Sequence, residues 1–223
     1  MIDYSLALRL SPQALLETLY MVLASSFFAC LIGLPLGFAL FETGKKRKNQ
    51  FIYKLLSFTV NVGRSIPFAI LMIALIPMTK WLIGTSLGTT AAIVPLSLAA
   101  APFFARLVEN NLKEVNPALE EASILMGGTP RQVLLKVLLP ESLPSQIRAI
   151  TLTTVNLIGY SAMAGLIGGG GLGQIALQYG YQRFNTFILT LSVIFLFLLV
   201  EITQKLSNKI VNSILQKRGQ KNA

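Results

Sequence analysis

The residue types that most often carry out chemistry in proteins are sparse in this sequence. It contains no histidine and a single cysteine, Cys30. Without histidine there is no imidazole metal ligand, no histidine general base and no Ser-His-Asp triad. Cys30 has no second cysteine with which to form an internal disulfide or a thiolate metal cluster. Most hydrolase chemistry is therefore excluded, and we expect neither a metal site nor a cofactor.

Polar side chains are instead concentrated in one apolar segment that starts near Ala149. They include Asn156, Tyr160 and Ser161, and Met163 follows closely. Polar groups at membrane depth usually face protein or water rather than lipid. Two interpretations are open. The segment could pack and hydrogen-bond against other helices, or it could line a translocation path in which the flexible thioether of Met163 acts as a gate.

Arg64 is the only strong charge well inside an apolar segment, and a cation at the centre of a bilayer is costly. If a membrane helix begins near Arg64, the side chain is an anchor that reaches the headgroups. The alternative is a pathway residue that pairs with Glu109 or with a carboxylate of a substrate. Glu109 also lies three residues after Arg106, a spacing that favours an ion pair at a helix end.

These residues lie in a chain with the composition of a membrane protein. Of its 223 residues 53% are hydrophobic and 13% charged, against roughly 45–50% and about 25% in soluble proteins. A helix of roughly 20 apolar residues spans a bilayer, and five runs approach that length: 18–41, 55–79, 81–105, one from residue 149, and 184–200. We therefore expect an all-α integral membrane fold with five transmembrane helices.

The fourth run is too long to cross a bilayer once. Arg148 and Arg183 bracket 34 uncharged residues, which would make about 51 Å of helix at roughly 1.5 Å per residue. Gly165 and the glycines of 168–173 predict a break, because glycine is a poor helix former. We expect the spanning helix to end near Gly165 and residues 168–182 to form a turn and a short interfacial piece.

The basic residues between the runs predict the orientation. Fifteen lysines and arginines fall after the first and third runs and in the tail, and three lie on the opposite side. Cytoplasmic loops carry the excess of Lys and Arg, so we expect the N-terminus outside and the C-terminus in the cytoplasm. The expected division is an extracytoplasmic segment (1–14), one membrane domain (15–207) and a basic cytoplasmic tail (208–223). Because the net charge of +10 is distributed in this way, nucleic-acid binding is not expected.

The cytoplasmic segment at about 116–140 predicts two short helices separated by a glycine turn. Asn116 and Thr129, each followed by proline, are typical helix N-caps. We expect Gly127 and Gly128 to end the first helix and Pro140 to end the second. Each helix has an apolar face, formed by Leu119, Ala122, Leu125 and Met126 in the first and by Val133, Leu134, Val137 and Leu138 in the second. Either face could pack beneath the membrane helices of this chain or dock onto a cytoplasmic partner.

A spaced motif runs through the same segment. Glu121, Ala122 and Ser123 are followed after three residues by Gly127, and after nine more by the tetrapeptide 137–140. This resembles the EAA signature of bacterial ABC importer permeases, commonly E-A-A, three residues, G, nine residues, I-x-L-P. The serine in place of alanine and the valine in place of isoleucine are the departures. In that family the loop forms coupling helices, which sit in a cleft of the ATP-hydrolysing subunit, and the permease is a dimer on an ATPase dimer. The resemblance implies a coupling region made of Glu120, Glu121, Ala122, Ser123, Gly127, Val137, Leu139 and Pro140.

Three further stretches carry a more specific resemblance. They are 64–68 (RSIPF), 84–110, and GYSAMAGLIGGGGLG at 159–173. Together they resemble the permeases of bacterial methionine importers. The resemblance, and not the composition, implies D- or L-methionine as substrate and a substrate-binding lipoprotein or periplasmic protein as a further partner. It also implies a place in the lipid of the bacterial cytoplasmic (inner) membrane. Related importers of other amino acids share the EAA loop, so another amino acid or small solute is an alternative substrate.

Three classes of function can be compared on these features. The sequence has no G-x-x-x-x-G-K-[ST] loop for nucleotide phosphates, so we expect a non-catalytic membrane subunit that is driven by a separate ATPase. A membrane enzyme is disfavoured by the missing histidines and by the lack of a paired carboxylate site. A membrane scaffold, which would bind a cytoplasmic partner without any transport, is the third alternative.

Overall fold

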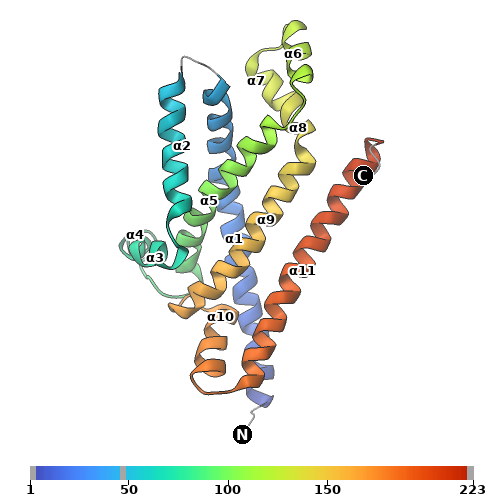
Figure 1. Ribbon diagram of the computed structural model, residues 1–223. Coiled ribbons are helices and arrows are strands. Elements are labelled where there is room, and N and C mark those ends of the chain that lie inside the picture. The colour runs from blue at the N-terminus through green and yellow to red at the C-terminus, as the bar shows by residue number, and fades with distance from the viewer. Residues whose placement is uncertain (1–3, 46–48, 220–223) are drawn as a thin grey trace.

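The computed structural model describes residues 4–45 and 49–219, and the regular secondary structure in these ranges is entirely helical (Figure 1). The long helices are α1 (Tyr4–Lys45), α5 (Thr89–Lys113), α9 (Leu143–Leu166) and α11 (Thr186–Lys217). The shorter elements are α2 (Gln50–Ser65), α3 (Phe68–Ala74), α4 (Ile76–Ile83), α6 (Pro117–Leu125), α7 (Pro130–Val133), the π-helical turn η2 (Leu134–Leu138), α8 (Leu139–Glu141), α10 (Gly171–Ile175) and the π-helical turn η3 (Ala176–Tyr181).

The long helices have the length and composition of membrane spans. In the described residues four of them, α1, α5, α9 and α11, can cross a membrane, and the bent pair α2–α3 makes a fifth if it is counted as one span. The all-α membrane class is therefore confirmed. With 42 residues, α1 extends about 63 Å at roughly 1.5 Å per residue. A hydrocarbon core is about 30 Å thick, so α1 continues well outside it.

The second apolar run, 55–79, does not form one continuous helix, because α2 and α3 meet at an angle of 102°. Pro67 has no N–H with which to continue the helix, and its ring keeps Ile66 extended, at φ −79° and ψ 125°. The expected start of the third span at Trp81 is wrong. Trp81 lies in α4, which ends at Gly84 in the left-handed conformation (φ 85°), and α5 begins only after that turn.

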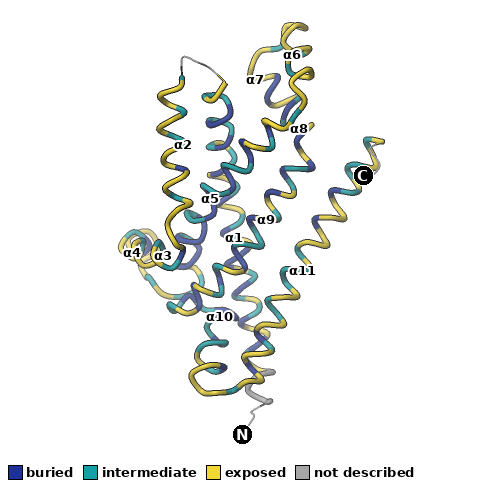
Figure 2. The backbone as a smooth tube through the Cα atoms, in the orientation of Figure 1, coloured by how far each residue is buried: buried dark blue, intermediate teal, exposed yellow. Residues whose placement is uncertain are grey.

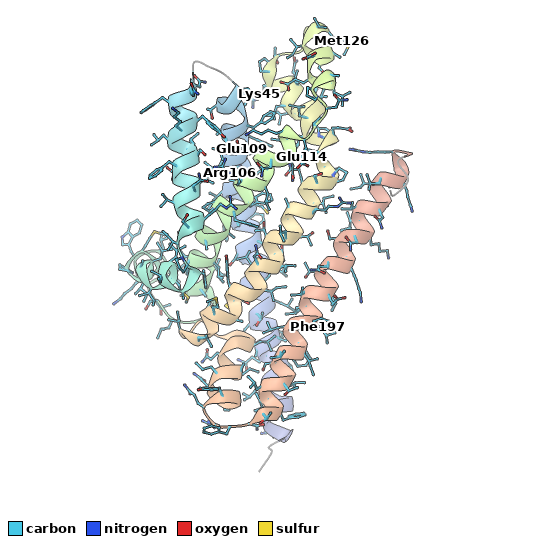
Figure 3. The ribbon with its side chains drawn as sticks, viewed as in Figure 1. Lys45, Arg106, Glu109, Glu114, Met126 and Phe197 are labelled. Atoms are coloured by element: carbon cyan, nitrogen blue, oxygen red, sulfur yellow. The ribbon has the colours of Figure 1, made fainter. Side chains whose placement is uncertain are left out.

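The buried centre of the bundle is formed by α1 and α5 (Figure 2). Two glycines of α1 permit their close approach. A Cβ on Gly33 would lie 2.8 Å from the carbonyl oxygen of Ala101, and a Cβ on Gly37 would lie 2.6 Å from the Cβ of Val108. Small residues at helix contacts allow such close packing in membranes. In contrast, α11 has few buried residues, and its Phe197 is exposed (Figure 3).

The glycine-rich segment after α9 folds back onto α1. As predicted, the helix ends close to Gly165, at Leu166, and the chain then forms a turn and the short elements α10 and η3. The backbone N–H of Gly171 donates to the Glu17 carboxylate at 2.8 Å, and the N–H of Leu172 donates to Thr18 Oγ1 at 2.9 Å. Glu17 directly precedes the first apolar run, and its contact with a residue 154 positions later was not predicted.

The two ends of the molecule carry different elements (Figure 1). The start of α1 and α10 lie at one end. The end of α1, the start of α2 and both α6 and α7 lie at the opposite end, toward which the C-terminal part of α11 also points. We refer to this as the α6 end. The helix α11 continues without a break to Lys217, past residue 207, where the expected membrane domain ends.

Candidate functional site

Both helices of the segment 116–140 begin where the sequence predicts. The Asn116 side chain accepts a hydrogen bond from the N–H of Ala118 at 3.0 Å and caps α6. Thr129 and Gln132 form a reciprocal capping box at the start of α7. Such caps satisfy N–H groups that have no partner within the helix.

Gly127 and Gly128 separate α6 from α7, and they do so for different reasons. Gly127 has φ +84°, a conformation that favours glycine, and a Cβ there would meet nothing within 4 Å. A Cβ on Gly128 would lie 2.7 Å from the carbonyl oxygen of Ser123, which accepts the Gly128 N–H at 3.0 Å. The sequence predicts that both glycines end the first helix, and the structure shows that Gly128 is the one that the close approach of the chain requires.

The apolar face of α6 is uncovered in the part of the chain that the structure describes. Leu125 is 88% exposed and Met126 is 83% exposed, and Met126 lies at the tip of this end of the molecule (Figure 3). We define the α6 surface as the exposed residues Leu119, Glu121, Ala122, Leu125 and Met126. A contiguous exposed apolar patch of this kind marks an interaction site.

The second helical stretch has the opposite surroundings. Val133, Leu134 and Leu138 are buried in a cluster with Phe41 of α1 and Phe104 of α5. Of the two alternatives that the sequence left open, packing beneath the chain's own helices is therefore correct for the second apolar face, and it does not hold for the first. The remaining motif residues Val137 and Leu139 are half-buried, and Pro140 is exposed.

Pro140 does not end the second helix as predicted. The chain stays helical through η2 and α8, and the N–H of Ser142 donates to the carbonyl of Leu138 at 2.9 Å. The wider π-helical turn directly before Pro140 accommodates a residue that has no N–H to donate. The guanidinium of Arg218, just beyond α11, donates to the carbonyl oxygens of Pro140 and Glu141. This contact ties the C-terminal part of the chain to the end of the motif.

One ion pair joins α6 to α1. The Lys45 ammonium, in the last turn of α1, contacts the Glu120 carboxylate, and Figure 3 shows Lys45 at the α6 end of the molecule. Lys45 also lies 3.9 Å from the centre of the Phe41 ring. Within α6, Ser123 donates its hydroxyl to the carbonyl of Leu119 at 2.6 Å. Glu120 and Ser123 thus act within the protein, whereas Glu121 and Ala122 of the same helix are exposed.

A buried carboxylate holds α2 against α5 (Figure 3). Glu109 is fully buried and accepts hydrogen bonds from Arg106 at 2.6 Å, Lys113 at 2.6 Å and the Tyr53 hydroxyl at 3.1 Å. Arg106 also donates to Asn61 of α2 at 2.9 Å. The predicted pair of Arg106 and Glu109 is confirmed, and the wider network was missed because the sequence does not show that α2 lies beside α5. Removing one partner of such a buried pair is strongly destabilising.

The predicted pathway residues of α9 do not converge on one point in the described chain. Tyr160 stacks on Phe68, with ring centres 4.7 Å apart and planes at 6°. Ser161 is buried and donates to the carbonyl of Ile158 at 2.7 Å. Asn156 is half-buried, and Met163 is 40% exposed on the surface of this chain. Within the single chain Ser161 is thus buried, whereas Tyr160 and Met163 face different surroundings, and the pathway role of these residues stays a prediction.

Tyr160 and Arg64 line the same pocket, although 96 residues separate them in the sequence. Its volume is about 460 Å³, and its lining also includes Phe68 and Phe103. Arg64 lies in the last turn of α2, fourteen residues after Gln50 and therefore about 21 Å along the helix axis at roughly 1.5 Å per residue. Arg64 therefore does not lie at the start of the helix that contains it, and its role as a membrane anchor or as a pathway residue stays a prediction.

The long apolar helices place this chain in the class of helical membrane proteins, and one short helix at its end has an uncovered apolar face. The family follows from comparison with known sequences. The model of the family described as "Binding-protein-dependent transport system inner membrane component" matches residues 29–212. The chain belongs to this family, and it is a non-catalytic inner-membrane component of a transporter.

Individual relatives are similar over most of their length. The chain is 46% identical over 200 residues to the probable D-methionine transport system permease protein MetI of Vibrio cholerae, and the match covers 89% of each chain. It is 50% identical over 195 residues to the protein of the same name from Pasteurella multocida, covering 86% of this chain and 90% of the relative. A solved structure of the MetNI methionine ABC transporter in an inward-facing conformation matches with a TM-score of 0.90 at 46% identity. This match covers 93% of this chain and 97% of the other.

Proposed function

We propose that this chain is the permease subunit of an ATP-driven importer for methionine, and that it couples to a separate ABC ATPase through the α6 surface. The observation that carries the proposal is the uncovered apolar face of α6, which lies within the EAA spacing. The relatives with 46–50% identity, which are named as D-methionine permeases, support the substrate. The match to a MetNI transporter supports an ATPase partner and a dimeric permease.

In this proposal the α6 end faces the cytoplasm and the start of α1 lies outside. Basic residues of the inter-span segments and of the tail support this orientation. The segment that contains α6 and α7 is then a cytoplasmic helix-turn-helix. An external substrate-binding protein would dock at the opposite end, near α10, and lipid would cover the exposed apolar side of α11.

The contacts around α6 suggest how a movement of the ATPase reaches the membrane helices. The α6 surface would sit in a cleft of the ATPase. Glu120 connects α6 to Lys45 at the end of α1, and Val133 and Leu138 connect the following stretch to the core between α1 and α5. Packed cores rearrange between discrete states rather than deform continuously. A displacement of α6 would therefore be passed to the two central helices of the bundle.

The pathway would lie between two copies of the chain, along α9 and the α2–α3 corner. Met163 is exposed in one copy, which makes it available to a second copy as a flexible closure point. Asn156 and Tyr160 lie on the same helix, and Arg64 lies across the pocket from Tyr160.

Uptake of labelled methionine tests the proposal. The cells would be a methionine auxotroph without other methionine carriers, supplied with the ATPase and binding-protein genes, with and without the gene for this chain. We expect uptake at sub-micromolar methionine that requires this chain and that is lost on ATP depletion. Competition with unlabelled D- and L-methionine would define the stereochemical range. A scaffold protein would assemble with the ATPase and give no uptake, and that result would contradict the proposal.

A further inference from the structure

The pocket at the α2–α3 corner is lined by the guanidinium of Arg64, a residue that is exposed on the surface of the single chain. Within the described ranges, the contact found for the Arg64 guanidinium is the Phe103 ring, whose centre lies 5.6 Å away. Glu109, the carboxylate that the sequence offered as a partner for Arg64, is instead occupied by Arg106, Lys113 and Tyr53. A charged side chain inside a membrane domain is costly unless it pairs or faces a wet cavity.

The rest of the pocket wall combines the polar residues Asn61 and Ser65 with a group of apolar and aromatic side chains. Phe68 and Tyr160 stack face to face, and Ala99 and Phe103 of α5 also line the pocket. Aromatic faces attract thioether sulfur, and they also bind aliphatic chains by burial. With a volume of about 460 Å³, the space is of the size of small-molecule sites, which are roughly 300–1,000 Å³.

Several contacts hold the walls of the pocket in place. The extended Ile66 and Pro67 set the bend between α2 and α3. Gly63 packs directly on Pro102, since a Cβ there would lie 2.8 Å from the proline Cγ. The hydrogen bond from Arg106 to Asn61 holds α2 on α5 one turn away. A pocket on braced helices can bind a ligand without first ordering its own walls.

We infer that this pocket is a transient binding site for the transported amino acid, with the substrate carboxylate on Arg64 and its uncharged side chain against Phe68, Phe103 and Tyr160. The inference rests on the proposed function and adds to it a place where the permease itself recognises the substrate. Arginine suits this role because its planar guanidinium binds a carboxylate through two parallel hydrogen bonds. The affinity must be modest, because a substrate in a pathway has to leave as well as bind.

Photolabelling tests the site directly. The purified complex of permease and ATPase in nanodiscs would be incubated, without binding protein, with a diazirine analogue of methionine. After illumination, labelled residues would be located by mass spectrometry. We expect adducts near the α2–α3 corner or on Phe103 and Tyr160, and we expect excess methionine to abolish them. Since a hydrogen bond to a charged group contributes roughly 1.5–3 kcal/mol, Arg64→Gln should lower the specific labelling about tenfold or more.

Two controls separate recognition from structural damage. Arg183 also stacks on an aromatic ring, 4.5 Å from the centre of Tyr179, and it lies outside the pocket, so Arg183→Gln should label as the wild type does. Methioninamide lacks the carboxylate. In the wild type, methioninamide should compete with the label much less well than methionine does. In Arg64→Gln, methioninamide and methionine should compete equally well. If Arg64→Gln does not assemble with the ATPase, Phe103→Ala is the second variant, for which we expect weaker labelling in an assembled complex.

The outcomes for the site and for the proposed function are distinct. Adducts elsewhere in the permease would overturn the inference while wild-type transport stands. The inference would also be overturned if an assembled Arg64→Gln or Phe103→Ala complex showed unchanged labelling and an unchanged KM for methionine. A wild-type complex that moves no methionine with ATP and binding protein present would overturn the proposed function itself.

Discussion

Two neighbouring helical stretches have similar apolar patterns and opposite surroundings. Leu125 in α6 is 88% exposed, whereas Leu138, thirteen residues later, is 2% exposed in the core between α1 and α5. The first stretch lies at the outer tip of the α6 end (Figure 1), whereas the second packs on the core between α1 and α5. The difference teaches that an amphipathic pattern predicts a covered face and does not predict which molecule covers it.

The clearest way to sharpen this comparison is to truncate the buried leucine. Leu138→Ala removes buried methyl groups and leaves a cavity, so we expect a loss of about 2–5 kcal/mol of unfolding free energy. Denaturant unfolding of the purified chain in detergent would measure it. Leu125→Ala is the matched control, with an expected change within about 0.5 kcal/mol because the side chain is exposed. Equal losses for the two leucines would show that α6 is also packed within this chain.

A charge on the α6 surface should have the reverse pattern of effects. We expect Leu125→Asp to leave the unfolding free energy nearly unchanged and to weaken binding of the ATPase about tenfold or more, since it would bury a charge in the contact. Binding would be measured by titrating the ATPase onto the permease in nanodiscs. Leu135→Asp, at an exposed leucine of the second stretch, is the control and should bind normally. If it alone weakened binding, the docking surface would lie on the second stretch.

The two glycines between the stretches allow a smaller test. We expect Gly127→Ala to cost about 1–2 kcal/mol, because alanine is strained at positive φ, and Gly127→Asn to restore part of this stability, because asparagine tolerates that conformation. For Gly128→Ala we expect about 1–3 kcal/mol, because its Cβ would press on the Ser123 carbonyl, and no rescue by asparagine. Unfolding curves of the four variants would distinguish a conformational role from a steric one. Rescue at both positions would contradict the steric role of Gly128.

The smallest effect concerns the ion pair between α1 and α6. Lys45 and Glu120 are partly exposed, and surface ion pairs contribute roughly 0–1 kcal/mol. Lys45→Gln should therefore change stability little while it lowers the methionine transported per ATP hydrolysed, because α6 loses a connection to α1. The reversed pair of Lys45→Glu with Glu120→Lys should recover the ratio. If Lys45→Gln left the methionine transported per ATP hydrolysed unchanged, the coupling would depend on the buried second stretch alone.

Much of this arrangement could be predicted from the sequence, and the failures have physical causes. Apolar runs identified the long helices, and Asn116 and Thr129 identified two helix starts, because caps and run lengths are local properties. The bend at Pro67 was not predicted, because the apolar content of a run does not depend on the direction of its backbone. The network around Glu109 and the contact between Glu17 and Gly171 were missed because they join residues 56 and 154 positions apart. Arg64 and Tyr160 were each identified, but only the fold brings them to one pocket.

Amide hydrogen exchange of the permease in nanodiscs, with and without the ATPase, tests the central comparison most directly. Exchange slows where a backbone becomes protected. The account predicts that the amides of α6 exchange faster in the permease alone and become protected when the ATPase binds. The amides of α7 and η2 should be protected already and should change little. Protection that appears in α7 and η2 instead of α6, or in neither stretch of an assembled complex, would contradict the account.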